Sequence, residues 1–148
     1  DALAQATGGQ RQRIQQASST DRGETWSVVT DSELPDPGAG LEVIALENGH
    51  WVLVNNDTEK GRHRLAVQLS DAEGRTWKCK RHLERDEPDA NAGRYGYPSI
   101  LQAKDGTLHA TYSVQLRPST VIPDAAGKPA HKTIRHVQFN EAWIRAGN

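Results

Sequence analysis

The 148-residue chain lacks methionine, has one cysteine, Cys79, and contains no long apolar run. A single cysteine excludes an internal disulfide bond. A membrane partner is not expected, because no apolar run approaches the roughly 20 residues that a spanning helix needs. An excess of charge of one sign is also missing, since 18 basic residues stand against 19 acidic ones. Without a basic stripe interleaved with aromatic residues, a nucleic-acid partner is not expected either.

Hydrophobic residues make up only 35% of the chain, and they occur in short runs rich in β-branched and aromatic residues. Such runs, separated by turn signals, are typical of an antiparallel all-β fold. The expected strands are RIQQAS (13–18), WSVVT (26–30), LEVIAL (41–46), HWVLVN (50–55), RLAVQL (64–69), PSILQA (98–103), TLHATYS (107–113) and TIRHVQF (133–139). The length fits a single domain.

Two hairpin signals repeat along the chain, because a strand, an Asn-Gly or Asp-Gly turn and a second strand occur at 43–56 and at 100–113. Repeating units of about 50 residues, each a four-stranded antiparallel meander, are the signature of β-propeller blades. The chain is therefore expected to hold the end of one blade (1–37), a complete blade (38–83) and a final blade (84–148).

A second repeat places a serine, a glycine and a tryptophan at fixed spacing, in STDRGETW (19–26) and SDAEGRTW (70–77). The glycines permit a tight reversal between the third and fourth strands of a blade, and short polar side chains hydrogen-bond the backbone of the turn. The tryptophans are expected to pack between blades. The motif is thus expected to be structural and to make no substrate contact, through Ser19, Asp21, Gly23 and Trp26 in the first copy and Ser70, Gly74 and Trp77 in the second.

The first copy resembles the Asp-box, S-x-D-x-G-x-T-W, of the sialidase (neuraminidase) superfamily at every defined position, whereas Ala72 replaces the aspartate in the second copy. The stretches 52–77 and 95–113 also resemble blade sequences of this family, and the resemblance extends over nearly the whole chain from about residue 13. It implies about half of a six-bladed sialidase-like β-propeller, namely the C-terminal half.

The resemblance implies that Tyr97 is the catalytic nucleophile, because it stands eight residues before Asp105, as the family's tyrosine stands before its Asp-Gly turn. A free phenol has a pKa of about 10 and attacks poorly at neutral pH, so the family pairs this tyrosine with a glutamate base. A tyrosine nucleophile is an exception among retaining glycosidases. The structural alternative is a strand tyrosine packed at the propeller axis.

Substrate-binding residues are also implied by the resemblance. Sialidases hold the substrate carboxylate with arginines, whose planar forks match a carboxylate. Arg62 stands at one of these positions, and Arg64 is the alternative if the register differs. Asp57 is a candidate for a polar contact with the sugar and Tyr95 for stacking on its ring, although surface solvation and packing would explain them equally well. The histidines show no ligand spacing, so neither a metal nor another cofactor is expected.

The function implied by the resemblance is an exo-acting, retaining glycoside hydrolase that removes a terminal acidic sugar. Ser113 replaces a family glutamate, and the glutamate base and the other arginines have no counterpart, so the chain alone is expected to be inactive. Two other functions stay open: a non-catalytic carbohydrate-binding propeller, and another polysaccharide-active propeller such as a uronate hydrolase or lyase. Because open blade faces must be covered, self-association or pairing with an upstream half-propeller is expected.

Overall fold

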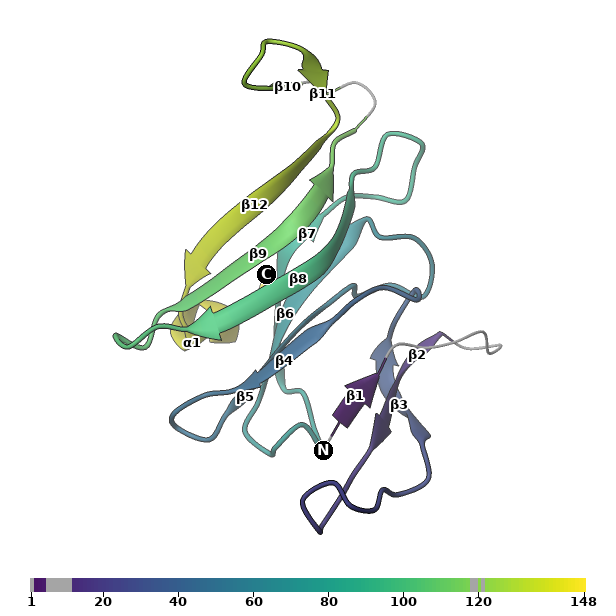
Figure 1. The fold of residues 1–148 in the computed structure, drawn as a ribbon, viewed down its shortest axis with the longest axis vertical. Helices are drawn as coiled ribbons and strands as arrows, with labels where there is room; N and C mark the ends of the chain where they lie inside the picture. Colours follow the sequence, from purple (N-terminus) through teal and green to yellow (C-terminus); the bar gives the residue numbers. More distant parts are fainter. Residues whose placement is uncertain (1, 5–11, 118–119, 121) are drawn as a thin grey trace.

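Strands dominate the computed structural model, which describes residues 2–4, 12–117, 120 and 122–148 (Figure 1). The strands are β1 (Ala2–Ala4), β2 (Arg13–Ala17), β3 (Thr30–Pro35), β4 (Glu42–Ala45), β5 (Trp51–Asn55), β6 (Arg64–Ser70), β7 (Cys79–Arg85), β8 (Arg94–Gln102), β9 (Leu108–Gln115), β10 (Ile122–Pro123), β11 (Pro129–Ala130) and β12 (Lys132–Phe139). The helix α1 (Glu141–Arg145) follows β12. The strand pairs are antiparallel, and the expected all-β class is confirmed.

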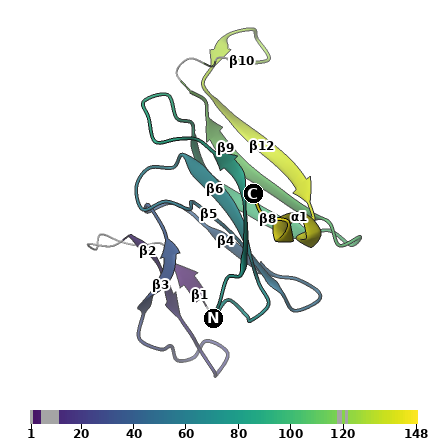
Figure 2. The same ribbon diagram turned by 180° about the vertical axis from the view of Figure 1, so that it is seen from behind.

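Three sheets follow one another along the chain and lie side by side (Figures 1 and 2). The first has the strand order β1-β2-β3, the second β4-β5-β6-β7 and the third β12-β9-β8. The second sheet is a four-stranded meander, which is the form of a propeller blade. The hairpin β10–β11 projects from one end of the third sheet. The division of the chain into blades at 37 and 83 stays a prediction.

The core lies between the second and third sheets. Its buried side chains include Val52, Val54, Leu65, Val67 and Leu69 from the second sheet and Ile100, Leu108, Ala110, Tyr112 and Val114 from the third. Burial of each large aliphatic side chain stabilises the fold by roughly 1.5–3 kcal/mol. The helix α1 packs against β6 and β7, and its Ile144 is fully buried. One face of β8 and β9 is thus fixed in the core, and the opposite face is turned away from it.

No helix in the described ranges is long and apolar enough to cross a membrane.

The two Asp-box turns have the same backbone conformation. Gly23 and Gly74 have φ angles of +91° and +78°, which glycine adopts without strain. The Ser19 hydroxyl accepts a hydrogen bond from the N–H of Gly23 at 2.8 Å, and the Ser70 hydroxyl accepts one from the N–H of Gly74 at 3.0 Å. The serine therefore fixes the reversal in both copies.

Asp21 completes the first turn. Its two carboxylate oxygens accept hydrogen bonds from the N–H of Thr25 at 2.9 Å and from the Thr25 hydroxyl at 2.5 Å. These bonds from Thr25, together with one from Ser19, hold the pKa of Asp21 well below its ordinary value. The ring of Trp26 differs from expectation: it is 50% exposed, and its Nε1 donates to the carbonyl of Gly23 at 3.1 Å. Trp26 therefore stabilises its own turn, because its indole N–H donates to a carbonyl within that turn.

The second turn lacks the carboxylate, and restoring it is expected to stabilise the protein. In the variant Ala72→Asp, the new carboxylate would accept hydrogen bonds from Thr76, which occupies the position of Thr25. The expected gain is about 0.5–1 kcal/mol, equivalent to roughly 1–4 °C in Tm, measured by thermal unfolding. The double variant Ala72→Asp/Thr76→Val removes the hydroxyl donor and should lose part of the gain. An equal gain in the single and double variants would contradict this explanation.

The prediction of a strand at 26–30 is wrong, because β3 begins only at Thr30. The segment before it closes the Asp-box turn: the N–H of Ser27 donates to the carbonyl of Ser18 at 2.8 Å. Val28, which made the segment strand-like in sequence, is 85% exposed. A local turn therefore overrides the β-propensity of this run.

The elements β7 and α1 have no counterpart among the expected strands. The strand β7 has the sequence CKRHLER, lies at the edge of the second sheet and lacks alternation of apolar and polar residues. The helix α1 starts after Asn140, whose side chain accepts a hydrogen bond from the N–H of Trp143 at 2.9 Å. An N-cap asparagine followed by glutamate is a helix-start signal that was present in the sequence.

Candidate functional site

A cavity of about 630 Å³ opens at the end of the third sheet where β8 begins and β9 ends. Its size is typical of a small-molecule site. Tyr97 and Arg62 line it together, and Tyr95 forms part of its wall. Further polar side chains come from β8, β9 and β12, namely Arg94, Ser113, Gln115, Lys132 and Thr133. The structure thus joins the two principal residues expected at an active site.

Tyr97 projects from an irregularity in β8. The pairing with β9 shifts between Gly96, which faces Ser113, and Ser99, which faces Thr111, so that β8 carries one residue more than its partner. An extra residue of this kind bends the strand and redirects a side chain. Tyr97 has a φ of +52° and is 69% exposed. Its ring is therefore presented outward instead of being buried in the core.

Arg62 lies over the exposed ring of Tyr97. Its guanidinium carbon is 5.5 Å from the ring centre, within the range of a cation–π contact. Its Nη2 donates to the carbonyl of Gly38 at 3.0 Å, and its own carbonyl accepts from the N–H of Tyr95 at 2.8 Å. The loop before β6 is thereby attached to β8. Among the described residues, no further hydrogen bond of this guanidinium is found, so most of its five donors can bind a ligand.

Tyr95 is a buried wall of the cavity. It is only 6% exposed, and its hydroxyl donates to a carboxylate oxygen of Asp86 at 2.9 Å. Burial and this hydrogen bond raise the pKa of Tyr95 far above its ordinary value. Its backbone carbonyl also accepts from the side chain of Asn56 at 3.2 Å. The hydroxyl is therefore committed to Asp86, and the residue holds the wall in place.

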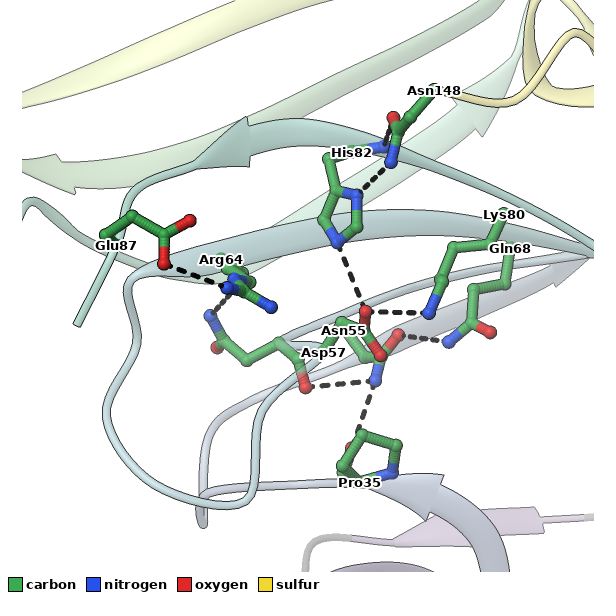
Figure 3. A network of polar contacts seen from close by, with 10 residues as sticks. Pro35, Asn55, Asp57, Arg64, Gln68, Lys80, His82, Glu87 and Asn148 are labelled. Carbon is green, nitrogen blue, oxygen red and sulfur yellow. Dashed lines mark hydrogen bonds and ion pairs between the residues drawn. The ribbon is translucent and has the colours of Figure 1, made fainter.

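Asp57 does not line the cavity and belongs to a separate polar network (Figure 3). Its carboxylate pairs with Lys80 at 2.8 Å and with Nε2 of His82 at 3.1 Å. His82 also contacts Asn148, whose side chain accepts from the His82 backbone N–H at 2.9 Å. Burial lowers the pKa of His82, although the hydrogen bond from its ring to Asp57 acts in the opposite direction. The network holds the end of the chain against β7.

Arg64 is placed outside the cavity as well. Its guanidinium lies 3.6 Å from the carboxylate of Glu87, and its Nε is buried without a hydrogen-bond partner. The side chain appears with this partner in Figure 3. Between the two arginines considered from the sequence, only Arg62 reaches the cavity with Tyr97.

The sequence analysis did not identify Arg94, Gln115 and Lys132, because none of them belongs to a recognisable motif. They form one row across the third sheet, because Arg94 and Lys132 both stand directly opposite Gln115 on the middle strand β9. Residues directly opposite one another in an antiparallel sheet share a face. Recognition of this row requires the register of three strands, which hairpin signals alone do not supply.

The charge of the cavity is unbalanced. Arg62, Arg94 and Lys132 all line it, and no carboxylate does so among the described residues. By contrast, two arginines next to the cavity are neutralised, since Arg117 pairs with Asp86 and Arg135 pairs with Glu84. A chain with a net charge of −1 therefore concentrates three positive charges in one hollow. Such a site attracts anions.

Within the described ranges, no group of three or more histidine, cysteine, aspartate and glutamate side chains is arranged to hold a metal ion.

Comparison with known proteins gives a family and a fold. Residues 2–110 match the BNR repeat-like domain family. A comparison with curated proteins gave no significant match. Among solved structures, the chain is similar to a leech intramolecular trans-sialidase complexed with 2,7-anhydro-Neu5Ac, prepared by soaking with 3′-sialyllactose.

The structural similarity has a TM-score of 0.67 at 16% sequence identity, and it covers 92% of this chain. At this identity the similarity shows the fold alone. The chain spans 22% of the length of the trans-sialidase. The expected sialidase-type propeller fold, present here as a part of one, is confirmed.

Proposed function

Since the chain belongs to the BNR repeat-like domain family, we propose that it supplies the carboxylate-binding half of a sialidase-like glycoside hydrolase. The proposed enzyme acts from the end of a glycan, on a terminal acidic sugar, with retention of anomeric configuration. The observation that supports this most is the Arg62 guanidinium 5.5 Å from the exposed Tyr97 ring, inside a cavity that is lined by cations.

Each residue has a separate role in the proposed reaction. Arg62 binds the sugar carboxylate through its planar fork, and the Tyr97 oxygen bonds to the anomeric carbon while the bond to the leaving oxygen breaks. The phenol proton passes to a base, and the leaving oxygen takes a proton from an acid. Water then attacks the anomeric carbon on the side opposite Tyr97 and gives its proton to the group that acted as the acid. The released Tyr97 oxygen takes its proton back from the base, and the two displacements give overall retention.

No carboxylate or histidine is among the described lining residues, so the glutamate base that the family pairs with its tyrosine is not supplied there. Natural glycosides have poor leaving groups that need a proton. We therefore expect the chain alone to bind an acidic sugar without turning over such glycosides. Complete activity would require residues from further blades of the same propeller.

A fluorinated sialosyl fluoride tests the assignment of Tyr97, because fluoride leaves without a proton and the fluorinated intermediate hydrolyses slowly. At about pH 10, where a free phenol ionises without a base, we expect mass spectrometry of the digested chain to find the sugar adduct on the peptide that contains Tyr97. The variant Tyr97→Phe should remain folded, since the side chain is exposed, and should give no adduct. An adduct on another residue, or none on the wild-type chain, would overturn the assignment.

A non-catalytic carbohydrate-binding propeller is the second candidate. It is favoured by Ser113, which lines the cavity where the resemblance implies a glutamate. Under this alternative, acidic sugars bind but the fluoride reagent leaves no adduct. A uronate-active enzyme would instead prefer uronosides to α-sialosides in the same binding measurement.

Self-association, or pairing with an upstream half-propeller, is proposed from the exposed sheet faces. Leu101 on the third sheet is 57% exposed, on the face turned away from the core. Light scattering over a concentration series should show the mass rising from monomer towards dimer. Leu101→Lys should suppress this rise, whereas Ile122→Lys on the β10–β11 hairpin should not. A monomer at every concentration would contradict self-association.

A further inference from the structure

The row formed by Arg94, Gln115 and Lys132 is the most strongly charged feature of the cavity to which the proposed reaction assigns no role. The three side chains come from neighbouring strands and share one exposed face of the third sheet, at the opposite end of β8 from Leu101, so that association through Leu101 leaves the row open. Adjacent strands lie about 4.8 Å apart, so the Cα atoms of Arg94 and Lys132 stand on either side of Gln115, about 10 Å from each other. The amide of Gln115 can donate a hydrogen bond between them.

Neither cation of this row is neutralised by the residues that the structure describes. In the part of the chain that the structure describes, no carboxylate forms an ion pair with Arg94 or Lys132. Two like charges held close together without an acidic partner repel each other. An anion placed between them removes this repulsion and gains charge-assisted hydrogen bonds.

The row is distinct from the contact between Arg62 and Tyr97. Arg62 lies beside Gly96, where a Cβ would stand 3.4 Å from its Nη1. Gly96 is two residues along β8 from Arg94, which corresponds to about 7 Å. A sugar carboxylate on Arg62 would therefore leave the row free for another group about one sugar ring away.

We propose that Arg94, Gln115 and Lys132 form a subsite for a second anionic group, a carboxylate or a sulfate, on the same glycan. The ligand class is thus an acidic glycan end with two negative charges, instead of one acidic sugar on a neutral chain. This inference rests on the proposed function only for the placement of the first carboxylate at Arg62.

Binding of matched ligands to the whole 148-residue chain tests the proposal. The one-anion probe is the methyl α-glycoside of N-acetylneuraminic acid, and the two-anion probe is the methyl glycoside of α2,8-linked disialic acid. We expect the two-anion probe to bind at least about tenfold more tightly in calorimetric titration. A chondroitin disaccharide with and without its sulfate distinguishes a sulfate from a carboxylate as the preferred second group.

The variants Arg94→Gln and Lys132→Gln should each reduce the ratio of the two affinities to near one. Lys104→Gln is the matched control, because this substitution removes the same charge and Lys104 is exposed at the opposite end of the same sheet. It should leave the ratio unchanged. An equal loss in Lys104→Gln would show general charge attraction and would overturn the subsite.

The outcomes separate this proposal from the proposed function. If the one-anion probe binds and neither two-anion ligand binds more tightly, the subsite is refuted while the carboxylate site stands. If no acidic sugar binds at all, both proposals are refuted.

Discussion

Replacing Arg62 with glutamine is expected to weaken the binding of methyl α-N-acetylneuraminide by about 30- to 100-fold. Hydrogen bonds to charged groups are each worth about 1.5–3 kcal/mol, and the variant loses the charge together with the two-pronged contact. Arg62→Lys keeps the charge but not the planar fork, so an intermediate loss is expected. Calorimetric titration of the three proteins with the sialoside gives the comparison.

Two controls separate recognition from folding in this experiment. Lys60→Gln removes a positive charge from the same loop, where Lys60 is exposed and does not line the cavity, and it should leave the affinity unchanged. Arg62→Gln also loses the hydrogen bond to the Gly38 carbonyl, so its thermal unfolding is measured alongside. A folded Arg62→Gln variant with wild-type affinity would contradict the assigned role of Arg62.

The architecture was largely predictable from the sequence, because sheet strands here follow short apolar runs that are separated by turn signals. The segments RLAVQL and TIRHVQF lie within β6 and β12 as expected. The prediction of a strand for WSVVT was wrong for a physical reason. Ser27 pairs with Ser18 across the Asp-box turn, and this local contact outweighs β-propensity. Propensity describes a fit to a pleated surface, which this segment never meets.

The site was predictable only in part. Tyr97 and Arg62 could be named from the resemblance to the sialidase family, and the structure places them together. Tyr95 and Asp57 show what spacing omits, since the first is buried with its hydroxyl on Asp86 and the second pairs with Lys80 and His82. Whether a polar side chain is free for a ligand depends on partners that are distant in the sequence. Such partners are set by register and loop path.

The same reasoning explains why the charge of the cavity escaped sequence analysis. The whole chain is nearly neutral, with acidic and basic residues interspersed. Folding divides the cations near the cavity into paired and unpaired ones. Arg117 forms an ion pair with Asp86, and Arg135 forms one with Glu84. Arg94 and Lys132 are left without such partners among the described residues. A local excess of charge thus arises from pairing in three dimensions and not from composition.

Replacing Asp86 with asparagine is expected to destabilise the fold by about 3 kcal/mol at pH 7. The carboxylate is 8% exposed and accepts hydrogen bonds from the N–H of Gly93 at 2.8 Å, from the Tyr95 hydroxyl at 2.9 Å and from Arg117. Removing the charge leaves Arg117 without its partner and weakens a network that is almost excluded from water. A fall in Tm of about 6–12 °C should follow.

The pH dependence of unfolding identifies the carboxylate as the cause. Burial raises the pKa of Asp86, but the hydrogen bonds from Gly93, Tyr95 and Arg117 outweigh it, and the net pKa lies below its ordinary value. A carboxyl with a depressed folded pKa stabilises the protein above its unfolded pKa of about 4, and this contribution is lost as the pH falls through the folded pKa. The difference between wild type and Asp86→Asn should therefore shrink below about pH 4.

Asp89→Asn is the matched control, because Asp89 is exposed in the same loop and should change the free energy of unfolding by less than about 0.5 kcal/mol. Tyr95→Phe removes one donor to Asp86 and should cost about 1 kcal/mol, since the other two hydrogen bonds remain. The Tyr95 hydroxyl donates to Asp86, and the Tyr95 N–H donates to the carbonyl of Arg62. The position of Arg62 beside Tyr97 therefore depends on this network. Asp86→Asn should consequently weaken sialoside binding as well, and a variant that unfolds earlier yet binds normally would show that the cavity is held independently of Asp86.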